Sequence, residues 1–342
     1  MIAAQARRSY ASLTFNGANV TERIKNYITD VSYTDVCCGA SDSISIKMYN
    51  ADDKWLNAWY PTKGDVVKGG FLFVNWNQMD EKIMMNFGTL ILDSIRATGG
   101  PSTMTIGAMA VPQDRSFKTR QRTKTWKSVS LQQIATEIAG RYGLSVQYNA
   151  KSHLVEELEQ TDKTDSDFLY STVKEYGLKM KVYNKKIVIF DMGRLEAKAP
   201  VRMITREDWI NDGWDYDDEL EGTYTGAIIG YKSDSGKDEI KVTVGNADED
   251  SPKSRVLYVN TKCDSHAEAM EKGAAAVNEA NEAMTKLKGT IWADPSIASG
   301  VTVTVEGLGK ASGKYLIDKV TTDLGASATK QTIEMHKCYK RL

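Results

Sequence analysis

One eight-residue pattern occurs twice in this 342-residue chain, once in each half. Residues 88–95 read Gly-Thr-Leu-Ile-Leu-Asp-Ser-Ile, and residues 313–320 read Gly-Lys-Tyr-Leu-Ile-Asp-Lys-Val. Each copy begins with Gly, runs through three bulky apolar residues to an Asp, and places a β-branched residue two positions later. Runs rich in β-branched and aromatic residues are typical of strands. The pattern therefore indicates a duplicated strand, and with it two similar β units in one chain.

Each copy follows another strand-like run that begins with Gly. Gly64 opens the first run and Gly300 opens the second, at residues 300–305. The spacing from this glycine to the repeat is longer in the N-terminal half. We expect two similar domains, so that each subunit would occupy two near-equivalent positions in an assembly. Two domains of different fold would contradict this hypothesis.

The size and charge of the chain exclude several classes of protein. Its length allows two or three domains with their own cores. The net charge of −1 gives no overall attraction to nucleic acid or to an anionic membrane. No apolar run approaches the roughly 20 residues of a membrane helix. Residues 1–13 lack the apolar stretch of a secretory signal, so we expect none.

The cysteines indicate a reducing compartment. There are four, Cys37, Cys38, Cys263 and Cys338, and no C-x-x-C motif that would suggest zinc. Adjacent cysteines rarely bond to each other, because a disulfide needs a Cα separation that neighbours do not easily adopt. We expect thiols in a protein assembled in the cytoplasm.

Residues 114–198 differ in character from the β-rich segments on either side. Ser130, with a Gln three residues later, has the spacing of a capping box, and Gly143 follows the apolar helical face that it opens. A second copy begins at Thr164 or Asp165 and ends at Gly177. Alternating apolar residues follow both glycines. The pattern predicts a small α+β domain of two helix–Gly–strand units.

The flanking segments, 1–113 and 199–342, contain many short strands separated by turns, a pattern typical of a barrel or sandwich. The second also contains an Ala-rich stretch that predicts a long helix at about 265–288, ended by Gly289. The predicted fold class is therefore α+β, mainly β. It has β domains at about 1–113 and 199–342, with the α+β domain at 114–198 inserted between them.

The histidines give no sign of catalysis. Only His153, His266 and His336 are present, and none belongs to a nucleophile or zinc-protease motif. We interpret them as ordinary surface or edge residues, with a role as ligand or base as the alternative. The sequence assigns no catalytic, cofactor-binding or metal-binding residue, and we predict a protein that is not an enzyme and has no cofactor.

A dense acidic and aromatic group begins the second β domain. It comprises Glu207, Asp208, Asp212, Asp215, Asp217, Asp218, Glu219 and Glu221, interleaved with Trp209, Trp214 and Tyr216. Carboxylates could serve a glycosidase, or the group could bind sugar or a cation, although its spacing matches no EF-hand loop. The preferred interpretation is a solvated loop whose aromatic residues anchor it to the domain or to a partner.

One basic run lies at the start of the inserted domain. It comprises Arg115, Lys118, Arg120, Arg122, Lys124 and Lys127, and the four central residues alternate with Thr and Gln. As a strand it would present one cationic face, which could meet DNA that passes nearby. A solvated connector, or a contact with an acidic partner surface, is the preferred interpretation.

Several of these segments resemble a known family. Residues 160–162 (Gln-Thr-Asp), 166–169 (Ser-Asp-Phe-Leu) and 175–178 (Glu-Tyr-Gly-Leu) resemble the central domain of phage tail hub proteins. The C-terminal order of Ala-rich helix, Gly289-Thr290, Pro295, a strand led by Gly300 and the repeat at 313–320 is similar to the late control protein D family of contractile phage tails and tailocins. This family includes hub proteins of Gram-positive prophages. The resemblance covers about 110–340 well and the N-terminal domain more loosely.

The resemblance implies a structural baseplate hub with two tube-like β domains per subunit. A homotrimer would form a ring of six similar domains that adapts a three-fold central spike to a six-fold tail tube. The implied partners are the spike, the tail tube protein, the baseplate wedge and, as a further candidate, the tape measure protein. DNA would be no more than passing cargo, and no membrane binding is implied. The protein would lie in the baseplate of a virion or tail-like particle, assembled in the host cytoplasm.

Two other functions stay open at this point. One is a hub-associated peptidoglycan-binding protein or cell-wall hydrolase, because residues 131–149 superficially resemble a LysM module, although the usual Gly-Asp-Thr entry is missing. The other is a secreted β-rich binding protein, which the lack of a signal peptide disfavours.

Overall fold

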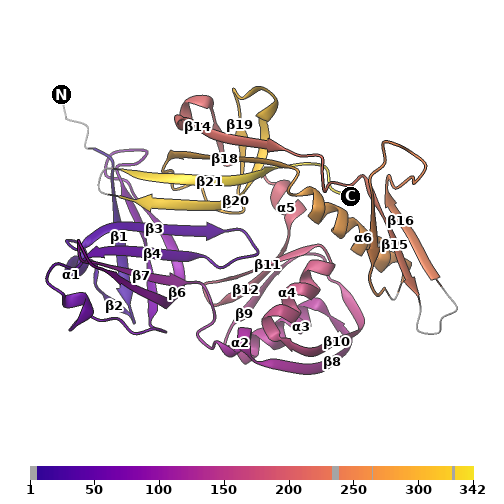
Figure 1. Ribbon diagram of the computed structural model, residues 1–342, viewed down its shortest axis with the longest axis horizontal. Helices are drawn as coiled ribbons and strands as arrows, with labels where there is room; N and C mark the ends of the chain where they lie inside the picture. The colour runs from indigo at the N-terminus through magenta and orange to yellow at the C-terminus, as the bar shows by residue number, and fades with distance from the viewer. Residues whose placement is uncertain (1–5, 233–238, 264, 326–327) are drawn as a thin grey trace.

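A computed structural model describes residues 6–232, 239–263, 265–325 and 328–342 (Figure 1). Its main feature is one large sheet, in which thirteen of the described strands take part, in the order β14-β18-β21-β20-β3-β4-β7-β6-β5-β1-β2, with β19 and β13 paired beside β20. The described pairings do not close this sheet into a barrel. The fold is mainly β with helices added, as the sequence predicts.

The N-terminal part of the sheet comes from residues 8–109. Its strands are β1 (Arg8–Phe15), β2 (Ala18–Asn19), β3 (Ile28–Val36), β4 (Ser43–Tyr49), β5 (Val66–Val74), β6 (Lys82–Thr98) and β7 (Thr103–Met109), with the short helices α1 (Thr21–Ile24) and η1 (Lys54–Leu56) between them. Alternation in β4 places Ile44, Ile46 and Met48 in the core, as period-two patterning requires.

The C-terminal part of the sheet comes from residues 202–218 and 285–337. Its elements are β13 (Arg202–Ile204), η2 (Arg206–Asp208), β14 (Trp209–Asp218), β18 (Thr285–Trp292), β19 (Thr302–Val305), η3 (Gly309–Ala311), β20 (Gly313–Leu324) and β21 (Thr329–Lys337). They enclose a second apolar core that includes Leu287, Ile291 and Tyr315.

The two copies of the sequence repeat occupy matching positions in these two parts. Residues 88–95 lie in β6 and residues 313–320 lie in β20. The pairing of β6 with β7 slips at Asp93, and the pairing of β20 with β21 slips at Asp318. An extra residue at such a slip is a β-bulge, which bends the strand and increases its twist. The repeated Asp therefore marks the same bend in both strands.

The strands before the repeat also match. Val66 of β5 lies opposite Ile91, and Thr302 of β19 lies opposite Leu316, which is the corresponding repeat position. The backbone N–H of Gly64 donates to the carbonyl of Leu92 at 2.8 Å, and that of Gly300 donates to Ile317, also at 2.8 Å. Both glycines have a positive φ, 95° for Gly64 and 75° for Gly300, a conformation that residues with side chains rarely adopt. The extra residues between the two glycines in the N-terminal half extend the β5–β6 hairpin. The strand register near the repeat is therefore the same in both β units.

Residues 116–196 form an α+β unit with its own core. Its elements are α2 (Ser116–Thr119), β8 (Gln121–Ser130), α3 (Leu131–Arg141), β9 (Ser145–Asn149), β10 (Leu154–Thr164), α4 (Asp165–Glu175), β11 (Leu178–Tyr183), β12 (Lys186–Asp191) and α5 (Met192–Glu196). Ser130 forms the predicted capping box, and the Thr164 side chain caps α4. Gly143 and Gly177 follow the helices with positive φ. The two predicted helix–Gly–strand units are therefore present.

A further α+β unit interrupts the C-terminal strands and was not predicted as a separate unit. It contains β15 (Gly226–Lys232), β16 (Glu239–Gly245), β17 (Val256–Asn260) and α6 (His266–Asn281). Helix α6 covers this three-stranded sheet (Figure 1) and shares a core with it that includes Ala227, Ile229 and Ala269. The predicted domain boundaries at 113/114 and 198/199 stay predictions.

The predicted helix at about 265–288 was too long. Helix α6 ends at Asn281, and β18 begins at Thr285. From Thr285 on, the burial alternates strictly, with Leu287, Gly289 and Ile291 facing the core. Gly289 is therefore a strand residue and does not end a helix. A Cβ at this position would lie 2.5 Å from the Trp209 ring, so the glycine makes room for the indole.

Replacing Gly289 should destabilise the fold by steric conflict with Trp209. We expect Gly289→Ala to lower the free energy of unfolding by about 1–3 kcal/mol, because the buried ring and the strand cannot both keep their places. Chemical denaturation measures this. Gly230→Ala, a strand glycine with open space around its Cβ position, is the control and should change stability little. Equal losses for both variants would contradict the steric explanation.

Candidate assembly surface

The N-terminal and C-terminal parts of the large sheet meet where β3 pairs with β20. Residues 31–36 run antiparallel to residues 319–324, with Tyr33 opposite Thr322 and Thr34 opposite Thr321. The two Thr hydroxyls of the latter pair are hydrogen-bonded at 3.2 Å. Figure 1 shows the two strands side by side at the centre of the sheet. This junction joins the two β units along their edges into one surface.

A buried ionic cluster holds the inserted α+β unit against this junction. Lys181 of β11 reaches Asp35 at 2.8 Å and Asp42 at 2.9 Å. Asp35 also accepts hydrogen bonds from the backbone N–H and the hydroxyl of Ser299, at 2.8 and 2.7 Å. Asp35 therefore links three parts of the chain: the N-terminal sheet, the inserted unit and the C-terminal strands.

The pKa values of the two carboxylates in this cluster shift in opposite directions. Burial alone would raise the pKa of Asp35, but Lys181 and the hydrogen bonds from Ser299 outweigh it and lower the pKa below its ordinary value. For Asp42, which is fully buried, desolvation dominates and raises the pKa in spite of Lys181. Lys181 therefore neutralises a pair of carboxylates that would otherwise repel each other.

Removing the cation from this cluster should be strongly destabilising. We expect Lys181→Met to cost about 3–5 kcal/mol, because it leaves the buried Asp42 and the partly buried Asp35 without a counter-charge. Adding Asp35→Asn and Asp42→Asn to that variant should recover part of the loss. Denaturant unfolding provides the measurement, and Lys186→Met, at an exposed position of the same unit, is the control. A triple variant that is less stable than Lys181→Met would refute this account.

A second buried cluster surrounds His336. Its Nδ1 lies 2.7 Å from the Asp318 carboxylate, and its Nε2 lies 2.9 Å from Glu196. Glu196 also accepts from the Arg341 guanidinium at 2.7 and 2.8 Å, and Arg341 also donates to Glu282, the residue directly after α6. The cluster therefore connects the repeat Asp of β20 with α5, α6 and the C-terminal residues.

These groups stabilise one another's charged forms. Burial would lower the pKa of His336, but hydrogen bonds and charges from Asp318 and Glu196 raise it to about 9. Burial would raise the pKa of Glu196, yet Arg341 and His336 lower it to about 2. At neutral pH His336 is an imidazolium between carboxylates, which is the protonation state of a structural ion pair and not of a general base.

The His336 cluster should make stability depend on pH. A histidine whose pKa is raised on folding contributes stability that is complete below its unfolded pKa of about 6.5 and disappears as the pH rises through about 9. The melting temperature of wild type should therefore exceed that of His336→Gln most near pH ~6, and the gap should narrow toward pH ~10. Thermal melts across this range test it. A gap that is constant with pH would show that the imidazolium charge contributes nothing.

The structure corrects the interpretation of two of the three histidines. His336 and His153 are buried, at 2% and 8% exposed, and not at the surface or an edge. His153 packs on the Tyr176 ring and lies 3.3 Å from Glu271 of α6. Only His266, the first residue of α6, is exposed as expected.

Within the described residues, no group of three His, Cys, Asp or Glu side chains is placed to hold a metal ion.

The acidic and aromatic group is a strand and not the predicted loop. Most of it lies in β14, where Trp209 is buried and the pairing with β18 slips between Trp209 and Trp214. Part of the charge is paired within the chain, since Asp208 binds Arg202 and Asp212 binds Arg206. Asp215, Asp217 and Glu219 are exposed. The group therefore places carboxylates along an outer strand of the sheet.

The basic run is also arranged differently from the prediction. Lys118 lies in α2, and only Arg122, Lys124 and Lys127 lie on the strand, β8. Arg122 pairs with Asp165 at 3.1 Å, and Lys124 pairs with Glu137 at 2.6 Å. These two side chains face the helices of their own unit. The described strand therefore lacks the continuous cationic face that was the alternative interpretation of this run.

Several strand edges are open among the described strands, and two of them belong to the repeated part of the large sheet. Strand β14 pairs with β18 on one side, and no described strand pairs with its other side. Strand β6 pairs with β5 as far as Ile91, and beyond its bulge residues 94–98 pair only with β7 among the described strands. Open edges present unpaired N–H and C=O groups that can pair with another strand. They are the clearest candidate interaction sites on the sheet.

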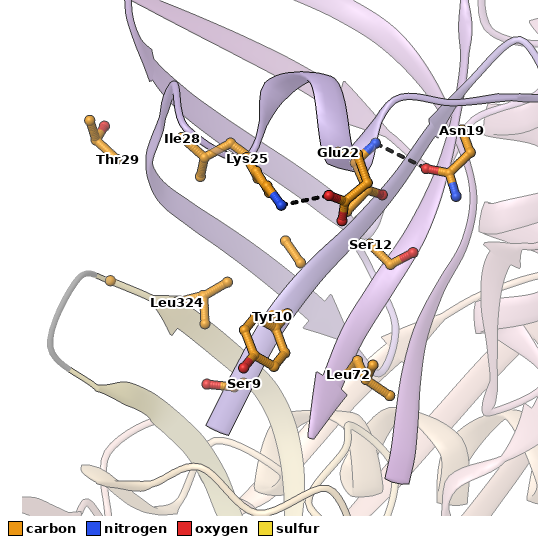
Figure 2. A pocket seen from close by; sticks show the side chains of 13 residues that line it. Ser9, Tyr10, Ser12, Asn19, Glu22, Lys25, Ile28, Thr29, Leu72 and Leu324 are labelled. Atoms are coloured by element: carbon orange, nitrogen blue, oxygen red, sulfur yellow. Dashed lines mark hydrogen bonds and ion pairs between the residues drawn. The ribbon is translucent and has the colours of Figure 1, made fainter. Parts of the chain in front are cut away.

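A hollow in the surface lies between strands of the N-terminal part and the end of β20. A groove of about 760 Å³ runs between β1, α1, β3 and the end of β20. Figure 2 shows Tyr10, Leu72, Ile28 and Leu324 along it, with Lys25 and Glu22 paired at the rim. The groove is open to solvent, and the charged side chains among its described lining residues, Lys25 and Glu22, pair with each other.

Comparison with solved structures relates this architecture to known proteins. The chain superposes on the 43 kDa tail protein of prophage MuSo2 from Shewanella oneidensis with a TM-score of 0.72 and 14% identity, covering 96% of this chain and 98% of the other. The values for a tail protein of Neisseria meningitidis are a TM-score of 0.71, 11% identity and coverage of 96% of both chains. The chain has the fold of phage tail proteins.

A component of a secretion system has a similar fold. The Escherichia coli c3393 protein, a component of the type VI secretion system with structural similarity to the T4 tail proteins gp27 and gp5, matches with a TM-score of 0.52 and 11% identity, over 92% of this chain and 74% of its own. No protein-family model and no curated protein matches the sequence. No described helix is long and apolar enough to cross a membrane. The tail fold covers nearly the whole chain, including both β units and the inserted unit.

Proposed function

We propose that this protein is the structural baseplate hub of a contractile tail or phage-tail-like particle. Three chains form a ring that adapts a three-fold central spike to a six-fold tail tube. The observation that carries the proposal is the shared register of the two β units, in which Gly64 and Gly300, and Asp93 and Asp318, hold equivalent positions. Three such chains supply six near-equivalent β units, which a six-fold tube requires at its end.

The continuity of the sheet supports a ring. Because β3 pairs with β20, the two units of one chain are already joined edge to edge in the manner of neighbours in a ring. Lys181 and the His336 cluster hold the helical units to this sheet, so that the chain can transmit force as one body. The similarity to phage tail proteins over 96% of the chain supports a place in a tail.

The proposed partners follow from this position. One face of the ring binds the central spike, and the other binds the tail tube protein. The baseplate wedge and the tape measure protein are the remaining neighbours, and DNA passes only as cargo. The protein acts in the baseplate after assembly in the host cytoplasm. Its role is mechanical and not enzymatic, and the ion-paired state of His336 supports this.

The oligomeric state tests this function. We expect light scattering on purified, concentrated protein to give three times the 37.9 kDa chain mass, and electron microscopy to show closed rings with six similar lobes. A species that keeps the mass of one chain at every concentration would contradict the proposal. Zymography on cell walls is the complementary measurement. Clearing that depends on a single carboxylate would favour the hydrolase instead.

A further inference from the structure

We propose that the open edges of β14 and β6 bind each other between copies of this chain. Strand β14 of one chain pairs antiparallel with residues 94–99 of a second copy, in the register that β3 and β20 use within one chain. The inference rests on the proposed ring and specifies its contact.

The register of the sheet makes β14 the counterpart of β3. Tyr33 of β3 lies opposite Ile44 of β4, which lies opposite Ala108 of β7. Tyr216 of β14 lies opposite Leu287 of β18, which lies opposite Met335 of β21. Ala108 and Met335 in turn pair with Leu92 and Ile317, the matching residues of the two repeats. Residues 31–36 therefore correspond to residues 214–219.

The same comparison makes β6 the counterpart of β20. After the bulge at Asp318, β20 leaves β19 and pairs with β3. After the bulge at Asp93, β6 has left β5, but no described strand takes the place of β3. Each strand of the β3–β20 pair therefore has an unpaired counterpart in the same chain. The counterpart of β3 is the open edge of β14, and the counterpart of β20 is the open edge of β6.

The side chains on these edges are complementary in charge. In the shared register Arg96 corresponds to Thr321, and Asp217 corresponds to Thr34, so that Arg96 of one copy lies opposite Asp217 of the next. Within the chain the equivalent position holds a Thr–Thr hydrogen bond. Arg96 and Asp217 are both exposed, and neither forms an ion pair or side-chain hydrogen bond with another described residue. Opposite charges on directly facing residues stabilise a strand pair.

A second contact supports the same register. Within the chain, Ser299 donates to Asp35 beside the junction. The residue equivalent to Asp35 is Asp218, and the residue equivalent to Ser299, just before the matching glycine, is Lys63. A second copy would therefore bring an exposed lysine to this carboxylate. Lys63 has no ion-pair partner in the described chain.

The contact is head-to-tail, because one edge of the chain binds a different edge of the next. Such a heterologous contact closes into a ring when the rotation between copies permits it. The internal β3–β20 junction and the proposed β14–β6 junction would then alternate around the ring. Each junction buries an open edge that would otherwise favour uncontrolled aggregation.

Charge reversal tests the contact. Arg96→Glu and Asp217→Arg should each weaken self-association about tenfold or more, since like charges then face each other, and the double variant should restore it. Sedimentation velocity over a concentration series measures the effect. The matched control reverses Arg120→Glu and Glu156→Arg, two exposed charges on the inserted unit, and should associate as wild type does. Single reversals that associate like wild type, or a double variant no better than either single, would overturn the inference.

Cross-linking tests the register itself. Directly opposite residues in an antiparallel pair have Cα atoms about 4.5–5.5 Å apart, within the range of a disulfide. A mixture of Arg96→Cys and Asp217→Cys chains should give a covalent two-chain species under mild oxidation. A mixture of Arg96→Cys and Asp215→Cys, shifted by two residues, should give much less. Wild type treated in the same way controls for the four native cysteines. Equal or stronger linking in the shifted mixture would refute the register.

The results separate this inference from the proposed function. If three-chain rings form equally well in the charge-reversal variants and the cysteine pair does not cross-link, the edge contact is wrong but the hub proposal is unaffected. Open multimers or two-chain species linked through positions 96 and 217 would support the edge contact and contradict the closed three-chain ring.

Discussion

The pairing of β3 with β20 is the contact on which the rest of the structure depends. It joins two β units that are far apart in the sequence into one sheet, and it determines where every other part can attach. Backbone hydrogen bonds between strand edges form with many sequences, so side chains must determine which strands pair and in which register. Asp35 supplies that definition, because it binds Ser299 from the C-terminal strands and Lys181 from the inserted unit at the same point.

The buried ionic groups explain how a chain with several separate cores behaves as one body. The cores of the N-terminal sheet, the inserted unit, the C-terminal strands and the α6 unit are distinct. Charged residues occupy the boundaries between them: Lys181 on one side of the inserted unit, and Glu196 with His336 and Arg341 on the other. Such pairs are directional and costly to separate, so they specify one arrangement of units more narrowly than apolar contact would. The proposed hub, which transmits force, needs that kind of definition.

Because the β unit is duplicated, the chain has two pairs of matching strand edges, β3 with β20 and β14 with β6. Only the β3–β20 pair forms within one chain. The other must be made with a second copy or left open. The acidic residues of β14 belong in this context, since a strand with Asp215 and Asp217 on its exposed face repels its own kind and attracts the basic edge at Arg96. In the proposed contact, these carboxylates select the basic edge of a second copy.

Local and periodic features were predictable from the sequence. The repeat with its Asp, the capping box at Ser130, the terminating glycines Gly143 and Gly177, and the alternation of β4 all depend on neighbouring residues, so they appear in the structure as predicted. The errors arose where distant residues decide the outcome. Gly289 has the appearance of a helix terminator, but its role is set by Trp209, which lies eighty positions away in the sequence and against it in space. The burial of His336 likewise depends on Glu196 and Arg341, which no local pattern connects.

The sequence by itself determined that there are two related β units and an inserted α+β unit, because duplication, caps and hydrophobic period are properties of short segments. The tertiary structure alone decided that these units share one sheet, that the charged residues Lys181, Asp35 and Glu196 lie at the boundaries between them, and which strand edges are left open. The physical reason is that strand pairing and ion pairing act through space, between residues whose separation along the chain carries no record of their contact.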